Sequence, residues 1–186
     1  MTSVAVVYFS QEGATHALAE SLCHGIRENG VDVSAHRIIA DDLVGGRFVT
    51  TAVLDVVDSC DAVVFGSPTY MGGPAAQFKA FADASSDRWE AQRWRNKIAA
   101  GFTCGTSPNG DQVATLQYFG LLAAQHGMLW LGLDLVDSDH EPVNRLGTQL
   151  GASAMTEAGV EAPDLLTARY LGRRVAQLSA GWAVKE

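Results

Sequence analysis

Residues 10–15 are the first in this sequence whose types and spacing could do chemistry. The stretch Ser10-Gln11-Glu12-Gly13-Ala14-Thr15 puts two hydroxyls, a carboxylate and a glycine directly after an apolar run that begins at Val4. Apolar residues then recur every four positions, which is typical of an amphipathic helix. A loop between a buried strand and a helix directs backbone N–H groups, hydroxyls and the positive helix end at one point, where phosphate binds well. The alternative is an ordinary turn in which Ser10 and Thr15 act as helix caps.

Two further loops have a similar character. Pro68–Gly73 contains two glycines and follows a buried run that begins at Asp61, and Thr103–Gly110 follows another that begins at Ile98. Glycine has no Cβ, so the backbone of such a loop can lie close to a flat ring. The first loop matches neither the G-x-G-x-x-G pattern nor the Walker pattern, so dinucleotide folds and P-loop NTPases are not indicated.

The spacing of apolar residues places these loops between alternating strands and helices. Strands are predicted at 4–9, 31–39, 61–68, 98–103 and 128–136, the third of them stopped by Pro68. Helices are predicted at 13–29, at 53–58, from Pro74 onward, at 112–126 and from 163 to about 178. The segment 41–46 is predicted as a loop, and 137–162 as a long excursion of irregular form.

Five alternations predict an α/β fold, a doubly wound five-stranded parallel sheet with helices on both faces and right-handed crossovers. Ligands of such sheets bind beyond the carboxyl ends of the strands, where the strand order reverses. In the order 2-1-3-4-5 the first, third and fourth strands are neighbours, so the three loops would converge on one crevice. The convergence predicts a phosphorylated ligand with a flat or polar remainder, in a single domain spanning residues 1–186.

Composition narrows the classes of function. Of the 186 residues, 47% are hydrophobic and 18% charged, which is typical of a globular chain. A net charge of −8 opposes binding to nucleic acid or to an anionic membrane. The three cysteines are widely spaced, which favours a reducing cytoplasm, and Met1-Thr2-Ser3 leaves no room for a signal peptide before the first strand. Residues 134–141 have no clean metal-ligand spacing and are predicted as a solvated loop, so we expect no metal.

Five motifs, taken together, resemble one known family. They are Ser10 to Thr15, Gly66-Ser67-Pro68-Thr69-Tyr70-Met71-Gly72-Gly73-Pro74 with the helix that follows, Thr103-Cys104-Gly105-Thr106 with Gly110-Asp111-Gln112, Gln125-His126-Gly127-Met128, and Ala168-Arg169-Tyr170-Leu171-Gly172. They resemble motifs of flavodoxin-like flavoproteins, and most closely those of the WrbA-type NAD(P)H:quinone oxidoreductases. The resemblance covers nearly the whole chain and is most specific in the second loop.

The resemblance implies a flavodoxin-like fold, a cofactor and a reaction. The cofactor is FMN and the donor is NADH or NADPH; hydride passes to flavin N5, and a quinone-like acceptor then receives two electrons. A homo-oligomer, a dimer or tetramer in which neighbouring subunits complete each site, is also implied. The implied cofactor contacts are Ser10, Gln11, Glu12, Gly13, Ala14, Thr15, Pro68, Thr69, Tyr70, Met71, Gly72, Gly73, Thr103, Cys104, Gly105, Thr106, Gly110 and His126.

Four residues are assigned to the substrate side of the site. Tyr70 and His126 could each donate a hydrogen bond to the quinone oxygen as charge develops on it. For His126, which precedes a glycine, the alternative is a C-terminal helix cap. Trp89 either walls a quinone pocket or simply packs against its neighbours. Glu12 stands where the resembling proteins carry an aromatic residue near the nicotinamide, so we expect weak NAD(P)H binding unless Glu12 is simply solvated.

Two other functions stay open at this stage. A flavodoxin-type electron carrier, without NAD(P)H oxidation of its own, is compatible with the net charge of −8 and would dock on redox partners through an acidic face. A relative that has lost its flavin, or that serves as a tailoring enzyme, is the third possibility. A yellow purified protein would exclude loss of the flavin.

Overall fold

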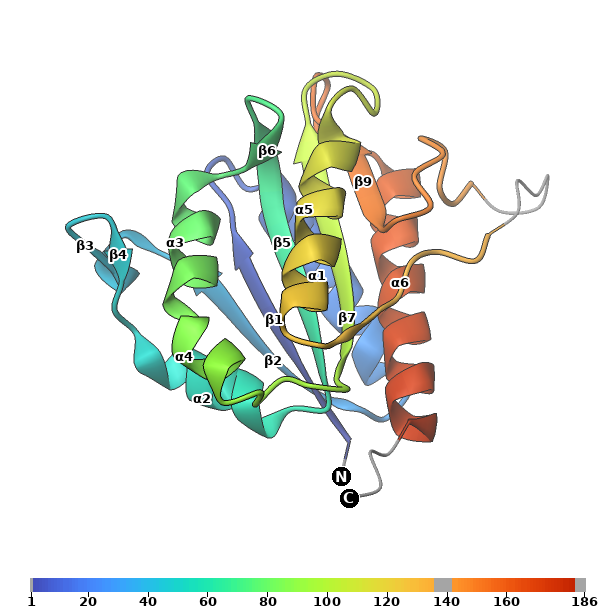
Figure 1. Cartoon of the computed structure of the whole chain (residues 1–186). Coiled ribbons are helices and arrows are strands. Elements are labelled where there is room, and N and C mark those ends of the chain that lie inside the picture. The colour runs from blue at the N-terminus through green and yellow to red at the C-terminus, as the bar shows by residue number, and fades with distance from the viewer. Residues whose placement is uncertain (1, 136–141, 183–186) are drawn as a thin grey trace.

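The computed structural model describes residues 2–135 and 142–182, and its centre is a twisted parallel sheet (Figure 1). The strands lie in the order β2-β1-β5-β7-β8, with β9 beside the carboxyl half of β7. Their bounds are β1 (Ser3–Phe9), β2 (Asp32–Ile38), β5 (Ala62–Tyr70), β7 (Ile98–Gly105), β8 (Leu129–Trp130) and β9 (Ala152–Met155). The predicted fold class is confirmed, and β2, β1, β5 and β7 occupy the order predicted for the first four strands.

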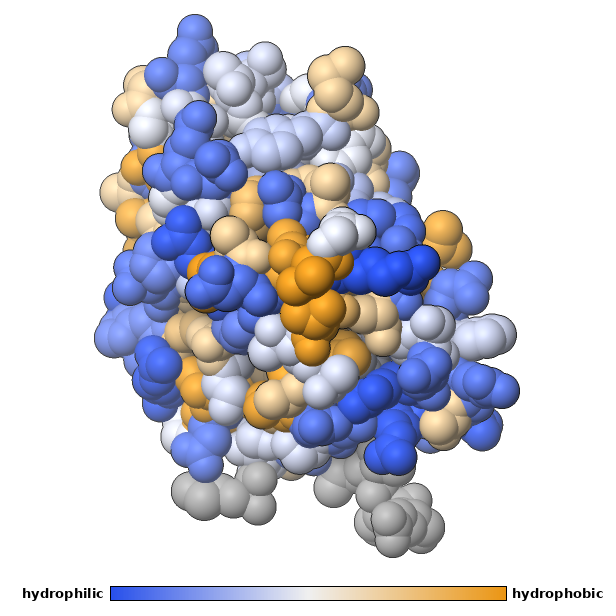
Figure 2. All heavy atoms as spheres, turned by 90° about the vertical axis from the view of Figure 1, so that its left-hand side faces the viewer, coloured by the Kyte–Doolittle hydropathy of each residue, from blue (hydrophilic) through white to orange (hydrophobic). Residues whose placement is uncertain are grey.

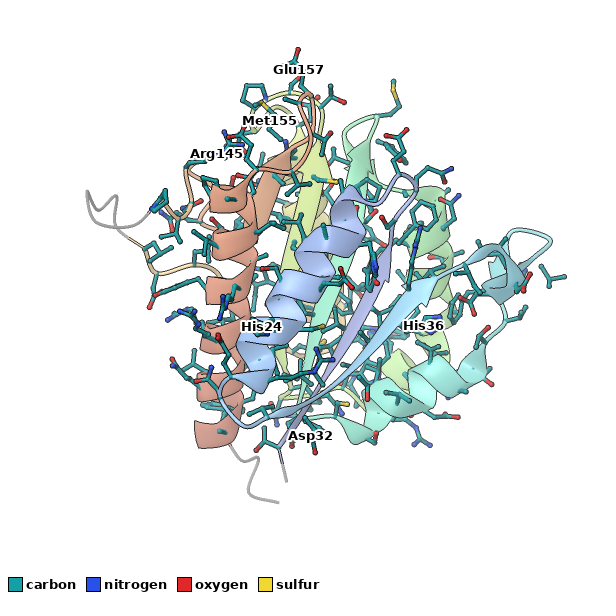
Figure 3. All side chains as sticks on the ribbon, turned by 180° about the vertical axis from the view of Figure 1, so that it is seen from behind. His24, Asp32, His36, Arg145, Met155 and Glu157 are labelled. Carbon is teal, nitrogen blue, oxygen red and sulfur yellow. The ribbon has the colours of Figure 1, made fainter. Side chains whose placement is uncertain are left out.

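Helices cover both faces of the sheet. On one face lie α1 (Ala14–Arg27) and α6 (Ala162–Gly181), which run side by side in Figure 3. On the other face lie α2 (Thr51–Ser59), α3 (Ala76–Ala84) and α5 (Gln112–Gln125), with the short α4 (Ser86–Glu90) after α3. Each β1 side chain therefore meets a helix on its own face, and for that reason β1 reads as one continuous apolar run.

The two helices on the first face touch through glycines. A Cβ placed on Gly172 of α6 would lie 2.1 Å from the backbone oxygen of Leu22 in α1. A Cβ on Gly25 would lie equally close, at 2.1 Å, to the oxygen of Arg169. Backbones this close leave no room for any side chain, so both positions require glycine. The contact fixes α1, and with it the loop at the start of α1, against the rest of the fold.

The prediction for the fifth strand is partly wrong. Only Leu129–Trp130 of the predicted range 128–136 pairs with β7, at its amino end, and residue 136 lies outside the described residues. The carboxyl half of β7 is paired instead by β9, which lies within the segment predicted as irregular. The sequence of β9, Ala-Ser-Ala-Met, has no strong strand propensity, so its pairing with Phe102–Gly105 comes from tertiary structure.

Two other predicted boundaries change. β5 does not stop at Pro68 but continues to Tyr70 and turns into β6 (Gly73–Pro74), because proline tolerates extended backbone where no amide is needed. The predicted loop 41–46 overlaps a short 3-10 helix (Ala40–Asp42). It also includes β3 (Leu43–Val44), which pairs with β4 (Arg47–Phe48) in a small hairpin. Figure 2 shows this side of the molecule, where apolar side chains reach the surface between hydrophilic ones.

Candidate functional site

The three polar loops meet at the carboxyl edge of the sheet. β1, β5 and β7 are adjacent, so the loops that follow them leave the sheet at the same edge. Thr15 Oγ1, just past the first loop, lies 3.3 Å from Cys104 Sγ at the end of β7. Burial raises the pKa of Cys104 and of Tyr70, and the nearby Glu12 carboxylate raises each of them further. The convergence predicted from the sequence is therefore present.

The first loop presents a helix end whose N-cap residue is a glycine. Gly13 has φ of 101°, a conformation that strongly favours glycine, and it has no side chain that could cap the first amides of α1. Ser10 Oγ accepts a hydrogen bond from the His16 amide (3.2 Å), which folds the loop back onto the helix. The preceding amides of the first turn thus point out of the helix end, as a bound phosphate requires.

The second loop is a tight hairpin turn. Tyr70 pairs with Gly73, and the two residues between them, Met71 and Gly72, have φ of 50° and 76°. Two positive φ values are typical of a type I′ turn, which suits glycine but strains methionine by about 1–2 kcal/mol. Met71 is fully exposed at the tip, so the turn holds an apolar side chain and a bare backbone at the rim of the site.

Three threonine hydroxyls beneath this turn form a chain with a fixed direction. Thr103 Oγ1 donates to the Ser67 carbonyl (2.7 Å), which uses its single proton. Thr69 Oγ1, 2.8 Å from Thr103 Oγ1, must then be the donor of that second bond. Thr115 Oγ1, also 2.8 Å from Thr69 Oγ1, must donate in turn. Thr69 can therefore only accept a hydrogen bond from a ligand.

The second and third loops enclose a hollow of about 450 Å³. That volume lies in the usual range for a small-molecule site. Gln112 is buried at its edge; its Nε2 donates to the Ser107 carbonyl (2.8 Å), while its Oε1 has no hydrogen-bond partner in the part of the chain that the structure describes. The lining residues are Thr69, Met71, Gly72, Gly105, Thr106, Ser107, Gly110, Asp111 and Gln112.

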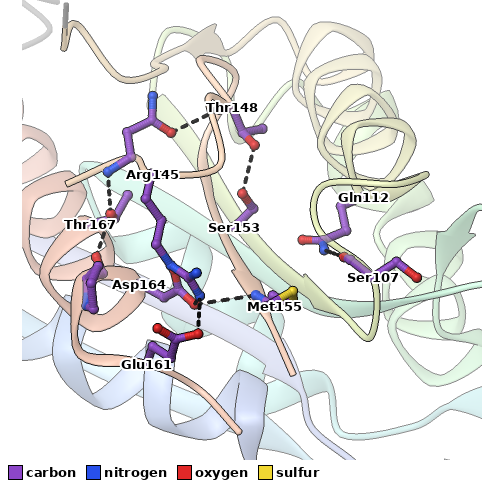
Figure 4. A network of polar contacts seen from close by, with 11 residues as sticks. Ser107, Gln112, Arg145, Thr148, Ser153, Met155, Glu161, Asp164 and Thr167 are labelled. Atoms are coloured by element: carbon purple, nitrogen blue, oxygen red, sulfur yellow. Dashed lines mark hydrogen bonds and ion pairs between the residues drawn. The ribbon is translucent and has the colours of Figure 1, made fainter. Parts of the chain in front are cut away.

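Sequence reasoning missed the segment that holds the third loop. Asn109, with φ of 50°, donates through Nδ2 to the Leu146 carbonyl (3.0 Å) and accepts from Thr148 Oγ1 (3.0 Å). Arg145 of the same segment forms a bidentate pair with Asp164, whose two oxygens lie 2.8 and 2.9 Å away (Figure 4). The segment thus ties the loop to the start of α6. The weak hydrophobic periodicity of this segment did not indicate a regular structure. The signal that could have found it is the pair of residue types, an arginine in the segment and an aspartate at the start of the next helix, which can form a bidentate ion pair.

His126 lies at the amino ends of the strands, opposite the loops, which leave the carboxyl ends. α5 starts at the third loop and runs back along β7, so its C-terminal residue His126 is near the amino end of β7, where the Asn96 amide donates to the Gly127 carbonyl (2.9 Å). At about 3.3 Å per residue, the length of β7 separates the two edges by roughly 25 Å. The prediction that His126 contacts the flavin and the quinone is therefore wrong for a single chain, because His126 does not reach the loops.

The surroundings of His126 keep its buried imidazole ring neutral. Its side chain is 2% exposed, its ring stacks on Trp94 with centroids 4.2 Å apart, and Nε2 lies 2.9 Å from Ser85 Oγ. Burial lowers the pKa of His126 to about 4. The residue caps α5 and packs, as the alternative interpretation held.

Trp89 is also remote from the loops of its own chain. It lies in α4, which follows the end of α3, and α3 runs from the loop edge of the sheet to the opposite edge. Its side chain is 46% exposed, so only part of it packs against the protein. The prediction that Trp89 forms a wall of the quinone pocket is therefore wrong for the loops of its own chain. Glu12 and Tyr70, in contrast, lie in the loops and near each other, since the Glu12 carboxylate raises the pKa of Tyr70, and both side chains are exposed.

Across residues 2–135 and 142–182, no group of three or more His, Cys, Asp or Glu side chains is placed to hold a metal ion. Most of the segment 134–141, predicted as a solvated loop, lies outside the described residues. No helix in the described part of the chain is long and apolar enough to cross a membrane.

The fold and the site define a class of protein. A doubly wound sheet carries an uncapped helix end after β1 and an open hollow between the β5 and β7 loops, which together accommodate a phosphate and a flat ring. The uncapped helix end and the orphaned Gln112 oxygen fit FMN, which has a phosphate at one end and ring N–H groups at the other. These features are those of an FMN-dependent NAD(P)H oxidoreductase with a flavodoxin-like fold.

Comparison with known proteins identifies the family. The family model described as NADPH-dependent FMN reductase matches residues 3–140, and this chain belongs to that family. It is 33% identical to flavodoxin FldP of Pseudomonas aeruginosa, over 96% of this chain and 97% of that protein. It is 30% identical to an NAD(P)H dehydrogenase (quinone) of Archaeoglobus fulgidus, over 96% and 98% of the two chains. The crystal structure of a flavodoxin, WrbA-like protein from Agrobacterium tumefaciens matches with a TM-score of 0.80 and 38% identity, covering 98% of this chain and all (100%) of that one.

Proposed function

We propose that this protein is an FMN-dependent NAD(P)H:quinone oxidoreductase built as one FMN-binding domain. The observation that carries the proposal is the convergence of three loops on a hollow of about 450 Å³ whose rim is open. Bound FMN supplies the chemistry, since it takes hydride from a nicotinamide and passes two electrons to an acceptor. Relatives named NAD(P)H dehydrogenase (quinone) support quinone as the class of acceptor.

The residues of this chain bind and orient the cofactor. The first-turn amides of α1 and Ser10 hold the phosphate, with the helix dipole favouring its charge. Thr69 and the orphaned Oε1 of Gln112 accept hydrogen bonds from ring N–H groups. Gly72 and Gly73 let the ring approach the backbone of the turn. The remaining members of the predicted cofactor set, apart from His126, lie in the same three loops.

Tyr70 is the residue proposed to act on the acceptor. Its side chain is 46% exposed at the rim, and its pKa is raised by burial and by the neighbouring Glu12, so its phenol is protonated at neutral pH. A protonated phenol can donate a hydrogen bond to the quinone oxygen as negative charge develops there. Replacing Tyr70 with phenylalanine removes only the donor and is expected to lower kcat and kcat/KM together.

A matched pair of glycine variants tests the proposed site. Gly72 and Gly45 both have positive φ, 76° and 56°, and a Cβ at either would meet nothing within 4 Å. Valine therefore imposes similar backbone strain at both, but only Gly72 borders the hollow. We expect Gly72→Val to lose FMN, measured by the flavin absorbance that stays with the protein after desalting, while Gly45→Val keeps it. Equal FMN retention in the two variants would refute the placement of the ring.

Rapid kinetics test the reaction itself. The FMN-loaded protein is mixed anaerobically with NADH or NADPH, and then with benzoquinone, while flavin absorbance is followed. We expect bleaching by a nicotinamide and full recovery with one equivalent of quinone. A flavin that stays oxidised with both nicotinamides would overturn the proposal.

An electron carrier is the second candidate, and two observations favour it. The chain is 33% identical to a protein named flavodoxin, and its net charge is −8, which suits docking on a basic redox partner. A redox titration separates the two functions. Two well-separated one-electron steps, together with no oxidation of NAD(P)H, indicate a carrier, whereas a single two-electron step indicates the oxidoreductase.

A homo-oligomer is the remaining proposal, and it gives Trp89 a role. Trp89 is exposed at the edge of the sheet opposite its own loops, so it can border a flavin only if that flavin belongs to another subunit. We expect Trp89→Ala to raise the KM for quinone while leaving FMN binding by each chain unchanged. Light scattering after gel filtration measures the assembly. A monomer at working concentrations would refute this role. The three buried, unpaired cysteines fit the proposed cytoplasmic location.

A further inference from the structure

We propose that Arg37 positions the phosphate loop and gives the site its preference for a phosphorylated flavin over an unphosphorylated one. The inference rests on the proposed placement of the FMN phosphate at the first loop. Arg37 lies in β2, outside the three loops, and was not among the residues that the sequence motifs indicated. Three features of its surroundings carry the proposal.

The first feature is a hydrogen bond to the root of the loop. Arg37 stands beside Tyr8 in the parallel register of β2 and β1, and its Nη2 donates to the Ser10 carbonyl (2.8 Å). Ser10 is the residue at which the chain leaves β1, and its Oγ accepts from the His16 amide. Ser10 is therefore held by β2 through its carbonyl and by α1 through its hydroxyl. Arg37 supplies one of the two contacts that set the direction of the loop.

The second feature is an unneutralised charge. Arg37 forms no ion pair with any carboxylate among residues 2–135 and 142–182, although most arginines of the chain do. Its charge acts across β1, because it opposes the rise that burial causes in the pKa of Tyr8. Two carboxylates near the loop, Glu12 within it and Glu20 in α1, would repel a phosphate dianion. The guanidinium is thus the cation available beside the loop to offset them.

The third feature is access to solvent and ligand. A hollow of about 430 Å³ lies on the β2 side of the loop, and Ser10, Gln11, Arg37 and Gln77 are among its lining residues. Within the described chain the guanidinium makes no hydrogen bond besides the one to Ser10. Because Arg37 lines this hollow and Ser10 does too, we propose that its charge acts on the phosphate through the field at the loop or through water.

These features predict a difference between two flavins. Riboflavin has the same ring as FMN and a hydroxyl in place of the phosphate. The Arg37 charge therefore strengthens binding of FMN only, whereas general damage to the fold would weaken both flavins. Binding of the charged ligand should also depend on ionic strength in proportion to the charges that face it.

The test compares four apoproteins: wild type, Arg37→Gln, Arg37→Lys and the control Arg47→Gln. Arg47 is exposed in β4, and its replacement removes the same charge at a distance from the loop. Dissociation constants for FMN and riboflavin are measured by quenching of flavin fluorescence at low and high salt. We expect Arg37→Gln to weaken the affinity for FMN about tenfold and to change the affinity for riboflavin less than twofold. The affinity of this variant for FMN should also depend less on salt than that of wild type. Arg37→Lys should recover part of the FMN affinity, and Arg47→Gln should match wild type.

Several outcomes would overturn the inference. Equal loss of FMN and riboflavin in Arg37→Gln would make Arg37 an anchor of the fold only. Unchanged FMN affinity with unchanged salt dependence would remove it from the site altogether, and so would an equal loss in Arg47→Gln. A wild-type protein that binds neither flavin would instead refute the proposed function, which keeps the two failures distinct.

Discussion

Replacing Thr103 with valine tests the direction of the hydroxyl chain beneath the proposed flavin ring. Valine keeps the shape of threonine but lacks its hydroxyl. The change removes the donor to the Ser67 carbonyl and also the acceptor of the Thr69 proton. Ser67 and Thr103 are fully buried and Thr69 is half-buried, so a group left unpaired costs about 1–3 kcal/mol, with Thr69 at the lower end. We therefore expect Thr103→Val to lower the free energy of unfolding by about 2–4 kcal/mol.

Thr115→Val is the matched control because it removes the other end of the chain. Thr115 only donates to Thr69, whose own proton stays bonded to Thr103. A donor lost without leaving a buried proton unpaired costs about 1 kcal/mol. Urea unfolding of the apoproteins, followed by circular dichroism, measures both changes from the transition midpoints.

FMN affinity gives a second, independent measure of the same chain. In Thr103→Val the hydroxyl proton of Thr69 loses its acceptor and turns toward the hollow. There it faces the N–H of the flavin ring, so Thr69 Oγ1 no longer accepts a hydrogen bond from the ring. We expect FMN to bind at least tenfold more weakly to Thr103→Val than to Thr115→Val. If Thr115→Val is as destabilising as Thr103→Val, or weakens FMN as much, then the assigned direction of the chain is wrong.

Three further predictions concern stability and substrate binding. Burial lowers the pKa of His126 to about 4, so between about pH 6.5 and pH 4 the unfolded chain binds a proton that the folded protein does not, and stability should fall as the pH drops through this range. In His126→Gln the urea midpoint should change less with pH over the same range. Gly172→Ala, whose Cβ would meet the Leu22 oxygen, should cost about 3 kcal/mol or more, whereas Gly181→Ala in the same helix meets nothing within 4 Å and should be neutral in thermal unfolding. Glu12→Gln should lower the KM for NADPH most at low salt, and a KM that salt does not change would contradict a repulsive role for Glu12.

The sequence was most informative where burial acts locally. β1 is covered on both faces, so its residues had to be apolar without interruption, and that run could be recognised directly. Likewise the change from apolar to polar and small residues at Ser10 marked the end of the strand, because a loop at the surface does not have to bury apolar side chains. The same reasoning located the loops after β5 and β7.

Local patterns failed where pairing depends on distant partners. β9 contains small residues of weak strand propensity, and only β7 lying open beside it makes it a strand. The motif match failed in a different way for His126. Gln125-His126-Gly127-Met128 matches a motif, but a motif carries no information on which end of the sheet the end of α5 will reach.

The sequence by itself thus determined the alternation of strands and helices, the three loops and the chemistry that those loops can offer. Each of these depends on the hydrophobicity, size and backbone freedom of neighbouring residues. The tertiary structure decided which distant groups meet: Arg37 with the Ser10 carbonyl, Asn109 with Thr148, and His126 with Trp94 rather than with the loops. Such contacts depend on strand register and on the direction in which each helix returns, and these are set by packing of the whole chain.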